Sequence, residues 1–299
     1  MSKLVLIDGN AILHRAYHAL PQTLTTRENE PINAVYGFTS MLLRVIQDLK
    51  PTHIAVCFDR KEPTFRKEMF EAYQAHRPET DVALSGQFPK AKKVSEAMNI
   101  PIFEKAGFEA DDLIGTIAKS AKVDEVNIVT GDRDILQLVD KKTKVYLPVK
   151  GLTSAVLMDE EKVVEKMGVR ADQIVDYKGL VGDPSDNYKG VPGIGPKTAE
   201  SLLDTYKTLE GIYKNLNKIP GSTAKKLKDN RDSAKTSQKL AKIIRNVEIH
   251  FDIDKSAKWQ VNSPQLLELF KNFGFKTLTK RVKDVGQKLE EEKQGSLFQ

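Results

Sequence analysis

The chain has 299 residues, of which 40% are hydrophobic and 29% charged, and its net charge is +6. This composition excludes an intrinsically disordered chain and allows one large core with a smaller attached domain. The single cysteine excludes an internal disulfide, and no apolar run approaches the ~20 residues that span a bilayer. We therefore expect a monomeric, cytoplasmic protein with no membrane partner.

Short apolar runs alternate with segments of helical periodicity in the first part of the chain. The expected strands are 4–7, 54–58, 100–103 and 126–130, and the clearest helices are 34–49 and 111–121. This alternation is typical of an α/β fold with a mostly parallel central sheet and flanking helices.

A charged segment with aromatic residues interrupts this pattern at about 64–98, which predicts a helical insertion above the sheet. Beyond residue 163 no strand is expected, and glycine-rich turns separate helical segments. We predict an α/β domain over 1–162, a C-terminal helical subdomain over 163–289 and a flexible tail over 290–299.

Charge is distributed unevenly along the chain. Residues 1–188 carry 25 basic and 28 acidic groups, whereas residues 189–299 carry 22 and 13, a net charge of +9. A basic helical half fits a polyanionic partner such as DNA, although lysines that only maintain solubility would give a similar balance.

Acidic residues follow the expected strands at the points where the strands end. Asp8 follows the first strand, Asp59 the second, and Asp132 with Asp134 a later one. The runs EADD and VGDPSDN add Glu109, Asp111, Asp112, Asp183 and Asp186. Each acid alone has a structural explanation in a turn or a helix cap. Because the carboxyl ends of parallel strands meet at one edge of a sheet, however, we expect the acids to converge.

Converging carboxylates repel one another, by roughly 4 kcal/mol for a pair 4 Å apart at an effective dielectric constant near 20. Several such pairs would rival the ~5–15 kcal/mol stability of a domain. Either some acids are protonated or cations lie among them. Oxygen ligands without Cys or His favour two Mg²⁺ ions, with Mn²⁺ as a substitute, and such a pair suits phosphodiester hydrolysis.

The segment GVPGIGPKT at 190–198 resembles a P-loop only superficially, because Pro196 separates Gly195 from Lys197 and no strand precedes it. A hairpin between two helices at about 174–205 is the better interpretation, with an ordinary turn as the alternative. Such a hairpin would bring backbone amides to a duplex phosphate without reading bases. The predicted DNA contacts are Arg66, Gly190, Gly193, Gly195, Lys197 and Thr198.

These motifs together resemble the 5′-nuclease superfamily, specifically the 5′→3′ exonuclease domain of bacterial DNA polymerase I and the stand-alone bacterial flap endonucleases. They occur in the family's order over nearly the whole chain, as LIDGN, CFDR, FRKEMFEAYQAHRP, EADD, TGDRD, GDPSDN and GVPGIGPKTA. The resemblance implies a metal-dependent nuclease that acts on DNA flaps, nicks and 5′ ends in replication and repair. It fits a stand-alone enzyme and a polymerase domain equally.

The resemblance also implies two sets of metal ligands. The first ion would be held by Asp8, Asp59, Glu109 and Asp111. The second would be held by Asp132, Asp134 and Asp186, with Asp111 shared, and Asp112 and Asp183 fall on further acidic positions of the family motifs. In relatives the hairpin binds K⁺ through backbone carbonyls, which implies a K⁺ site here.

The segment at 64–98 resembles the helical arch under which a 5′ single strand passes. There Tyr73 would stack on a base and Arg77 would hold the scissile phosphate, with Lys67 as a further cation. Relatives usually carry Lys beside the arch tyrosine, where this chain has Gln74. The arch is therefore expected to be less charged than in relatives.

The end of the chain resembles the short peptide by which bacterial replication proteins dock on the sliding clamp. The residues that carry this resemblance are Gln294, Leu297 and Phe298. An accidental apolar end is the alternative.

Two functions of other classes compete with the nuclease. One is a non-catalytic protein that binds DNA junctions, in which the acids only balance charge. The other is a PIN-like ribonuclease on a similar sheet, which would not need the hairpin and the basic helical half. A nuclease assay with Mg²⁺ and then with EDTA separates catalysis from binding alone.

Overall fold

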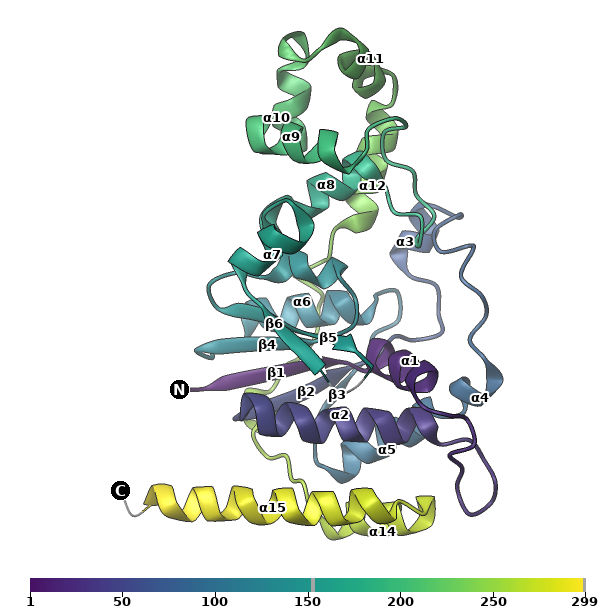
Figure 1. The fold of residues 1–299 in the computed structure, drawn as a ribbon, viewed down its shortest axis with the longest axis vertical. Coiled ribbons are helices and arrows are strands. Elements are labelled where there is room, and N and C mark those ends of the chain that lie inside the picture. The colour runs from purple at the N-terminus through teal and green to yellow at the C-terminus, as the bar shows by residue number, and fades with distance from the viewer. Residues whose placement is uncertain (152–153, 298–299) are drawn as a thin grey trace.

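The computed structural model of the chain describes residues 1–151 and 154–297. A six-stranded sheet of order β3-β2-β1-β4-β5-β6 lies at its centre (Figure 1). The strands are β1 (Lys3–Asp8), β2 (His53–Cys57), β3 (Ile102–Phe103), β4 (Glu125–Val129), β5 (Thr143–Lys150) and β6 (Ser154–Met158). Neighbours from β3 to β5 pair in parallel and β6 pairs antiparallel to β5, which confirms the predicted mostly parallel sheet.

Helices cover both faces of this sheet. Leu4 and Leu6 of β1 face the core formed with α6, whereas Val5 and Ile7 face the core formed with α1, α2 and α5. Because both faces are buried, β1 has an unbroken apolar sequence. The bounds of these helices are α1 (Gly9–Ala19), α2 (Asn33–Leu49), α5 (Phe88–Ala97) and α6 (Ala110–Ser120).

Two strands and part of the arch differ from the sequence-based expectation. β5 and β6 lie outside the predicted strands; Lys and Pro interrupt the apolar pattern of β5. Of the segment 64–98, the part between α3 (Phe65–Met69) and α4 (Val82–Ser85) stands off the sheet, and Leu84 of α4 is already buried in the core beside α2. α5 instead packs Ala91 and Val94 into the core beside α2, so the predicted insertion ends before α5.

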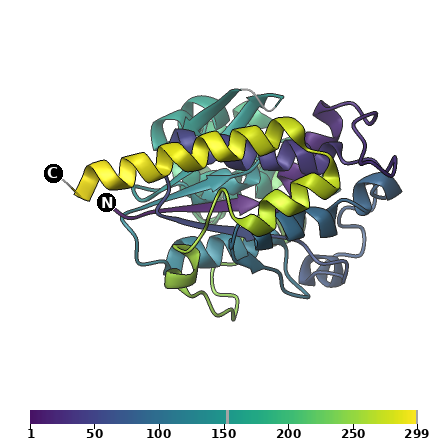
Figure 2. The same ribbon diagram turned by 90° about the horizontal axis from the view of Figure 1, so that it is seen from below.

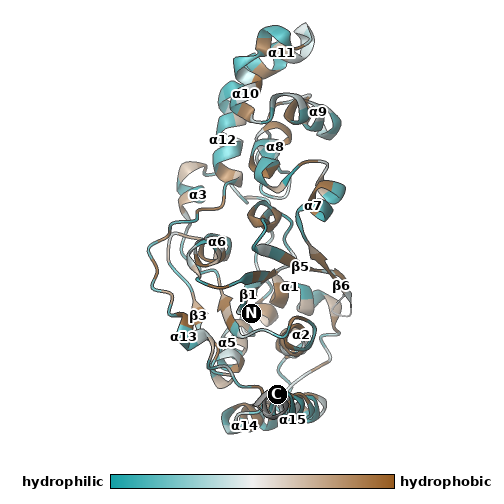
Figure 3. Cartoon of the chain, turned by 90° about the vertical axis from the view of Figure 1, so that its left-hand side faces the viewer, coloured by the Kyte–Doolittle hydropathy of each residue, from teal (hydrophilic) through white to brown (hydrophobic). Residues whose placement is uncertain are grey.

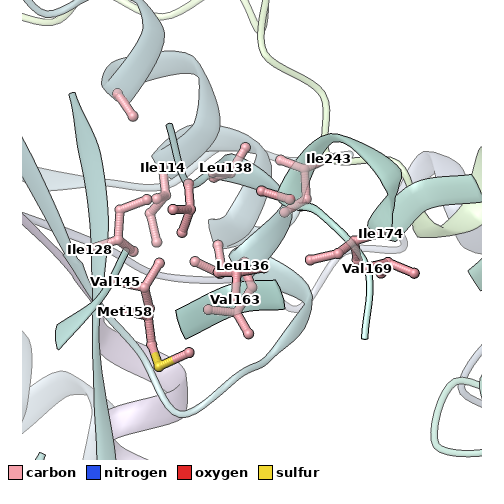
Figure 4. Packing of buried hydrophobic residues seen from close by; sticks show 14 of the residues in the cluster. Ile114, Ile128, Leu136, Leu138, Val145, Met158, Val163, Val169, Ile174 and Ile243 are labelled. Atoms are coloured by element: carbon pink, nitrogen blue, oxygen red, sulfur yellow. The ribbon is translucent and has the colours of Figure 1, made fainter. Parts of the chain in front are cut away.

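A helical region continues from the sheet. Its elements are α7 (Glu160–Met167), α8 (Ile174–Val181), α9 (Pro196–Tyr206), α10 (Leu209–Lys214), α11 (Gly221–Asp229) and α12 (Arg231–Ala241). The short α13 (Ile253–Ser256) lies back beside the sheet, where it contacts β2. Hydrophilic residues predominate on α11 and α12 (Figure 3). A shared core attaches this region to the sheet, with Leu136 and Val163 between Ile128 and Ile174 (Figure 4).

The last two helices do not belong to this helical region. α14 (Pro264–Phe273) and α15 (Lys276–Leu297) lie at the opposite end of the molecule, where they contact α5 and α2 (Figures 1 and 2). Phe270 and Val282 are buried in the same core as Val5. The prediction of one helical subdomain over 163–289 is therefore wrong for its final part.

The tail predicted over 290–299 begins within α15, which continues to Leu297, and its flexibility stays a prediction. Of the residues predicted to bind a clamp, Phe298 and the side chains of Gln294 and Leu297 lie outside the described part of the structure. Within the described residues, no helix is long and apolar enough to cross a membrane.

Candidate metal centre and nucleic-acid interface

A cleft of about 690 Å³ opens at the carboxyl edge of the sheet. Seven of the nine predicted acidic ligands line it, namely Asp8, Asp59, Glu109, Asp111, Asp132, Asp134 and Asp186. Asp8 ends β1 and Asp59 follows β2, while the EADD run begins α6. The parallel topology thus brings together acids that are far apart in the sequence, as predicted.

Asp8 and Asp59 are fixed by the helices that begin beside them. Asp8 caps α1 by accepting the Ala11 N–H at 2.9 Å, and its second oxygen accepts the Thr130 hydroxyl at 2.7 Å. Asp59 accepts the Ala110 N–H at 2.6 Å, which links the end of β2 to α6. Burial and the neighbouring Asp59 raise the pKa of Asp8 to about 7.

The pKa values of two other acids at this edge are raised for similar reasons. Burial, Asp132 and Asp8 raise the pKa of Asp111 well above its usual value. Burial raises the pKa of Glu109 to about 7 although Arg66 opposes this rise. Negative charge is therefore unfavourable here unless a further cation compensates for it.

Asp134, Asp183 and Asp186 form a second, tighter group. Each offers a carboxylate oxygen, and these atoms lie within 4.8 Å of one another. Asp134 begins the 3-10 helix η1 (Asp134–Leu138), and the other two lie in the loop after α8. The resemblance gave Asp183 only as a further acidic position, and the structure places its carboxylate within this group.

Lys178 of α8 contacts two members of the second group. Its Nζ lies 2.7 Å from Asp134 Oδ1 and also donates to Asp183. Burial opposes the charge of this lysine, but Asp134 and Asp183 outweigh that effect and raise its pKa to about 12. The sequence analysis missed Lys178, which lies five residues before Asp183 and just outside the VGDPSDN motif.

Asp112 is the clearest exception among the predicted ligands. It is fully buried, and each of its oxygens accepts an Arg66 N–H at 2.8 Å. The backbone N–H groups of Glu109 and Ile244 bind the same two oxygens at 3.1 and 2.8 Å. These donors leave Asp112 a structural partner of Arg66 rather than a metal ligand.

Arg66 is consequently not a DNA contact in this structure. Its side chain is 2% exposed, and it also donates to the carbonyls of Leu240 and Lys242. One guanidinium N–H reaches Glu109 at 3.1 Å. The predicted role is corrected: Arg66 positions α6 against the chain that follows α12.

The arch closes over Asp186. Three arch residues donate to the Asp186 carboxylate: the Arg77 guanidinium at 2.6 Å, the Tyr73 hydroxyl at 3.2 Å and the Gln74 amide at 3.3 Å. Tyr73 is buried, so it does not present the exposed ring that base stacking needs, and this prediction is not met here. Lys67 lines the cleft but donates to the Tyr73 carbonyl at 3.2 Å.

The residues of the cleft fit divalent cations. Their donors are carboxylate oxygens, the ligands that Mg²⁺ and Mn²⁺ prefer. Near the second group of acids, the buried Tyr188 hydroxyl has no hydrogen-bond partner among the described residues. The charges of Asp134, Asp183 and Asp186 contribute to raising the pKa of Tyr188, after burial.

The predicted hairpin joins α8 to α9, as expected. Gly193, Gly195 and Lys197 are exposed at its turn. Thr198 is partly exposed in the first turn of α9, and the Lys226 ammonium donates to the Gly193 carbonyl at 3.1 Å. The turn is therefore accessible to a phosphate from outside.

Gly190 has a structural position instead of the predicted surface one. It is buried with φ +62°, its N–H donates to Ser237 and its carbonyl accepts from Ser233. A Cβ at this position would lie 2.4 Å from the Gly182 nitrogen. Gly190 lets the chain turn tightly beside α12, and a direct contact with DNA is not supported.

A mostly parallel sheet with acids at its carboxyl edge, joined to a helical half that carries a hairpin, is the arrangement that the resemblance to metal-dependent 5′ nucleases implies. Residues 3–168 match the family described as 5′-3′ exonuclease, N-terminal resolvase-like domain, and residues 169–267 match the 5′-3′ exonuclease, C-terminal SAM fold. The chain belongs to the 5′-3′ exonuclease family.

Curated relatives agree with this assignment. DNA polymerase I of Caldicellulosiruptor bescii is 42% identical over 284 residues, which cover 94% of this chain and 33% of that protein. DNA polymerase I of Bacillus subtilis is 40% identical, with 94% and 32% covered. The chain thus spans about a third of the length of the curated relatives it matches.

Solved structures share the fold at low sequence identity. The T5 5′-exonuclease with bound zinc superimposes with a TM-score of 0.64 at 21% identity, covering 95% of this chain and 98% of that one. The catalytic core of Rad2 in complex with DNA substrate gives a TM-score of 0.61 at 14% identity, covering 95% and 91%.

Proposed function

We propose that the chain is a structure-specific 5′ nuclease that hydrolyses DNA phosphodiesters at flaps, nicks and 5′ ends with two divalent ions. The observation that carries this proposal is the cleft at the sheet edge, where seven acids from separate elements converge beside Arg77. Membership of the 5′-3′ exonuclease family supports it, as do a neighbour with bound zinc and another with bound DNA substrate. A role in replication and repair follows from the same family.

Mg²⁺ is the ion we propose, with Mn²⁺ as a substitute. Asp8, Asp59, Glu109 and Asp111 would hold one ion, and Asp132, Asp134, Asp183 and Asp186 would hold the other. When bound, such ions activate water and neutralise charge on the leaving oxygen. The acids fix where these ions can bind, and the helices α1 and α6 fix the acids.

Arg77 is the proposed contact for the scissile phosphate. Its side chain is 52% exposed, and the contact to Asp186 uses one end of a guanidinium group that has five N–H donors. On DNA binding the arginine would pass from Asp186 to the phosphate, and Tyr73 would remain a positioning residue for Asp186. Gln74 provides a neutral hydrogen bond to Asp186 where relatives usually carry Lys.

We propose that duplex DNA docks on the basic helical half through Gly193, Gly195, Lys197 and Thr198. Backbone amides and a nearby ammonium would grip phosphates without reading sequence, so binding should weaken as salt rises. A K⁺ ion at this hairpin would compete with the Ser233 and Lys226 donors for the carbonyls of Gly190 and Gly193.

A sliding clamp is the proposed protein partner of a monomeric enzyme, through Gln294, Leu297 and Phe298. The support is the motif alone. Replacing Leu297 and Phe298 by Ala should abolish clamp binding in a pull-down while cleavage of isolated flaps is retained. Unchanged clamp binding would dismiss this partner.

The proposal is tested by incubating the chain with 5′-labelled flap, nicked and single-stranded DNA in Mg²⁺ and then in EDTA. We expect cleavage of the flap near the junction in Mg²⁺ and none in EDTA. Binding to the flap without cleavage in Mg²⁺ or Mn²⁺ would instead establish the non-catalytic junction-binding protein.

A further inference from the structure

One lysine lies among the acids of the second metal position. Lys178 contacts Asp134 and Asp183, which are two of the three residues whose oxygens lie within 4.8 Å of one another. Its side chain is only 13% exposed and lines a smaller pocket beside the cleft, together with Asp132, Asp134, Asp183 and Asp186. Asp186, the third acid, is bound by Arg77.

A protein cation also contacts the first half of the acidic edge, but at only one proposed ligand. Arg66 lies 3.1 Å from Glu109, and its other N–H groups bind Asp112 and two backbone carbonyls. Lys178, in contrast, contacts two of the three acids of the second group. The second group therefore already holds an ammonium between its proposed ligands.

We propose that Lys178 is a resident counter-ion that competes with the second divalent ion for Asp134 and Asp183 and thereby weakens the binding of that ion. This inference rests on the proposed two-ion nuclease. An incoming ion must break two charge-assisted hydrogen bonds of the ammonium before it gains the same oxygens. The unbranched lysine stem allows the ammonium to swing aside, so the competition is reversible.

Lys178 is a positioning residue in this account, and its effect is measured without DNA. Mn²⁺ is titrated into the full chain by calorimetry, for the wild type and for Lys178→Met, which keeps the stem and removes the charge. We expect the weaker Mn²⁺ site to tighten at least tenfold in the variant, with the tighter site changed less than twofold. Lys178→Arg should restore weak binding.

Lys189→Met is the matched control, because Lys189 is an exposed lysine in the loop that follows Asp183 and Asp186. It should leave both Mn²⁺ affinities unchanged. Equal affinities for the wild type and Lys178→Met, or weaker binding by the variant, would overturn the inference while leaving two-ion binding intact. A wild type that binds no Mn²⁺ would overturn the proposed function as well.

Thermal melting separates competition from a merely structural role. Without metal, Lys178→Met should melt below the wild type, because three acids then crowd together without the ammonium. In saturating Mn²⁺ its melting temperature should recover to that of the wild type. An equal loss of melting temperature with and without metal would mean that Lys178 forms only a structural ion pair.

If the variant does not fold, NMR of the wild type provides the test. The ¹³Cε resonance of Lys178 should shift as Mg²⁺ occupies the weaker site, and a resonance that does not respond to Mg²⁺ would refute the competition.

Discussion

Carboxylates with almost the same sequence context have different roles because their hydrogen-bond donors differ. Asp111 and Asp112 are adjacent, yet Asp111 lines the cleft while Asp112 faces Arg66 inside the protein. The sequence motif shows only that both residues are acids. The position of Arg66, which is fixed by its hydrogen bonds to the Leu240 and Lys242 carbonyls, determines that Asp112 is the one that pairs with it.

Removing the Arg66 guanidinium should lower the free energy of unfolding strongly. We expect Arg66→Met to destabilise the fold by ~3–5 kcal/mol, because Asp112 would remain buried without its partner. Urea unfolding measures this loss. Arg170→Met is the control, since its pair with Asp172 is exposed, and it should change stability little. Equal stabilities for Arg66→Met and the wild type would show that Asp112 does not depend on this arginine.

At the scale of the element, the functional residues lie at the ends of strands and helices. The strand ends that carry Asp8 and Asp59 were predictable, because a buried parallel strand is a plain apolar run. The hairpin was predictable from its glycines and Pro196. The packing of α14 and α15 against α5 and α2 was not predictable, because the sequence of an amphipathic helix does not indicate which surface its apolar side will contact.

The roles of arch residues were also beyond prediction from the sequence. Tyr73 and Arg77 were identified as functional residues, but their shared contact with Asp186 depends on how the arch folds onto the loop after α8. That contact joins residues more than 100 positions apart, and no local pattern encodes it.

Glycine substitutions in the hairpin should separate its folding role from its binding role. Gly190→Ala should destabilise the protein by about 1–3 kcal/mol from its positive φ alone, and the close approach of Gly182 adds to this cost. Gly195→Ala meets nothing within 4 Å and should cost clearly less stability, limited to the poorer N-cap that Ala gives α9, while it weakens duplex binding. Urea unfolding and fluorescence anisotropy with labelled duplex measure the two effects. Equal stability losses at both positions would contradict this division of roles.

For the whole molecule, the acidic edge should make stability depend on pH and metal together. The pKa values of Asp8 and Glu109 are raised to about 7 in the folded chain. Their contribution is therefore present at low pH and is lost as pH rises through about 7, because the unfolded chain releases these protons more easily. Without metal, the melting temperature should fall between pH 5.5 and pH 8.

Mg²⁺ should restore that stability mainly at the higher pH, since it binds the ionised carboxylates. Calorimetric melting at both pH values, with Mg²⁺ and with EDTA, checks this expectation. A Mg²⁺ effect of the same size at pH 5.5 and pH 8 would mean that the raised acids are not the metal ligands.

The account depends most on the converging acids being the catalytic metal site. Flap cleavage and flap binding by Asp132→Ala test this directly, because Asp132 lines the cleft and its charge acts on Asp8 and Asp111. Asp140→Ala, which removes an acid from an exposed turn, is the control. We predict that Asp132→Ala binds flap DNA as the wild type does but cuts none of it in Mg²⁺. Cleavage by Asp132→Ala at the rate of the wild type would contradict the account.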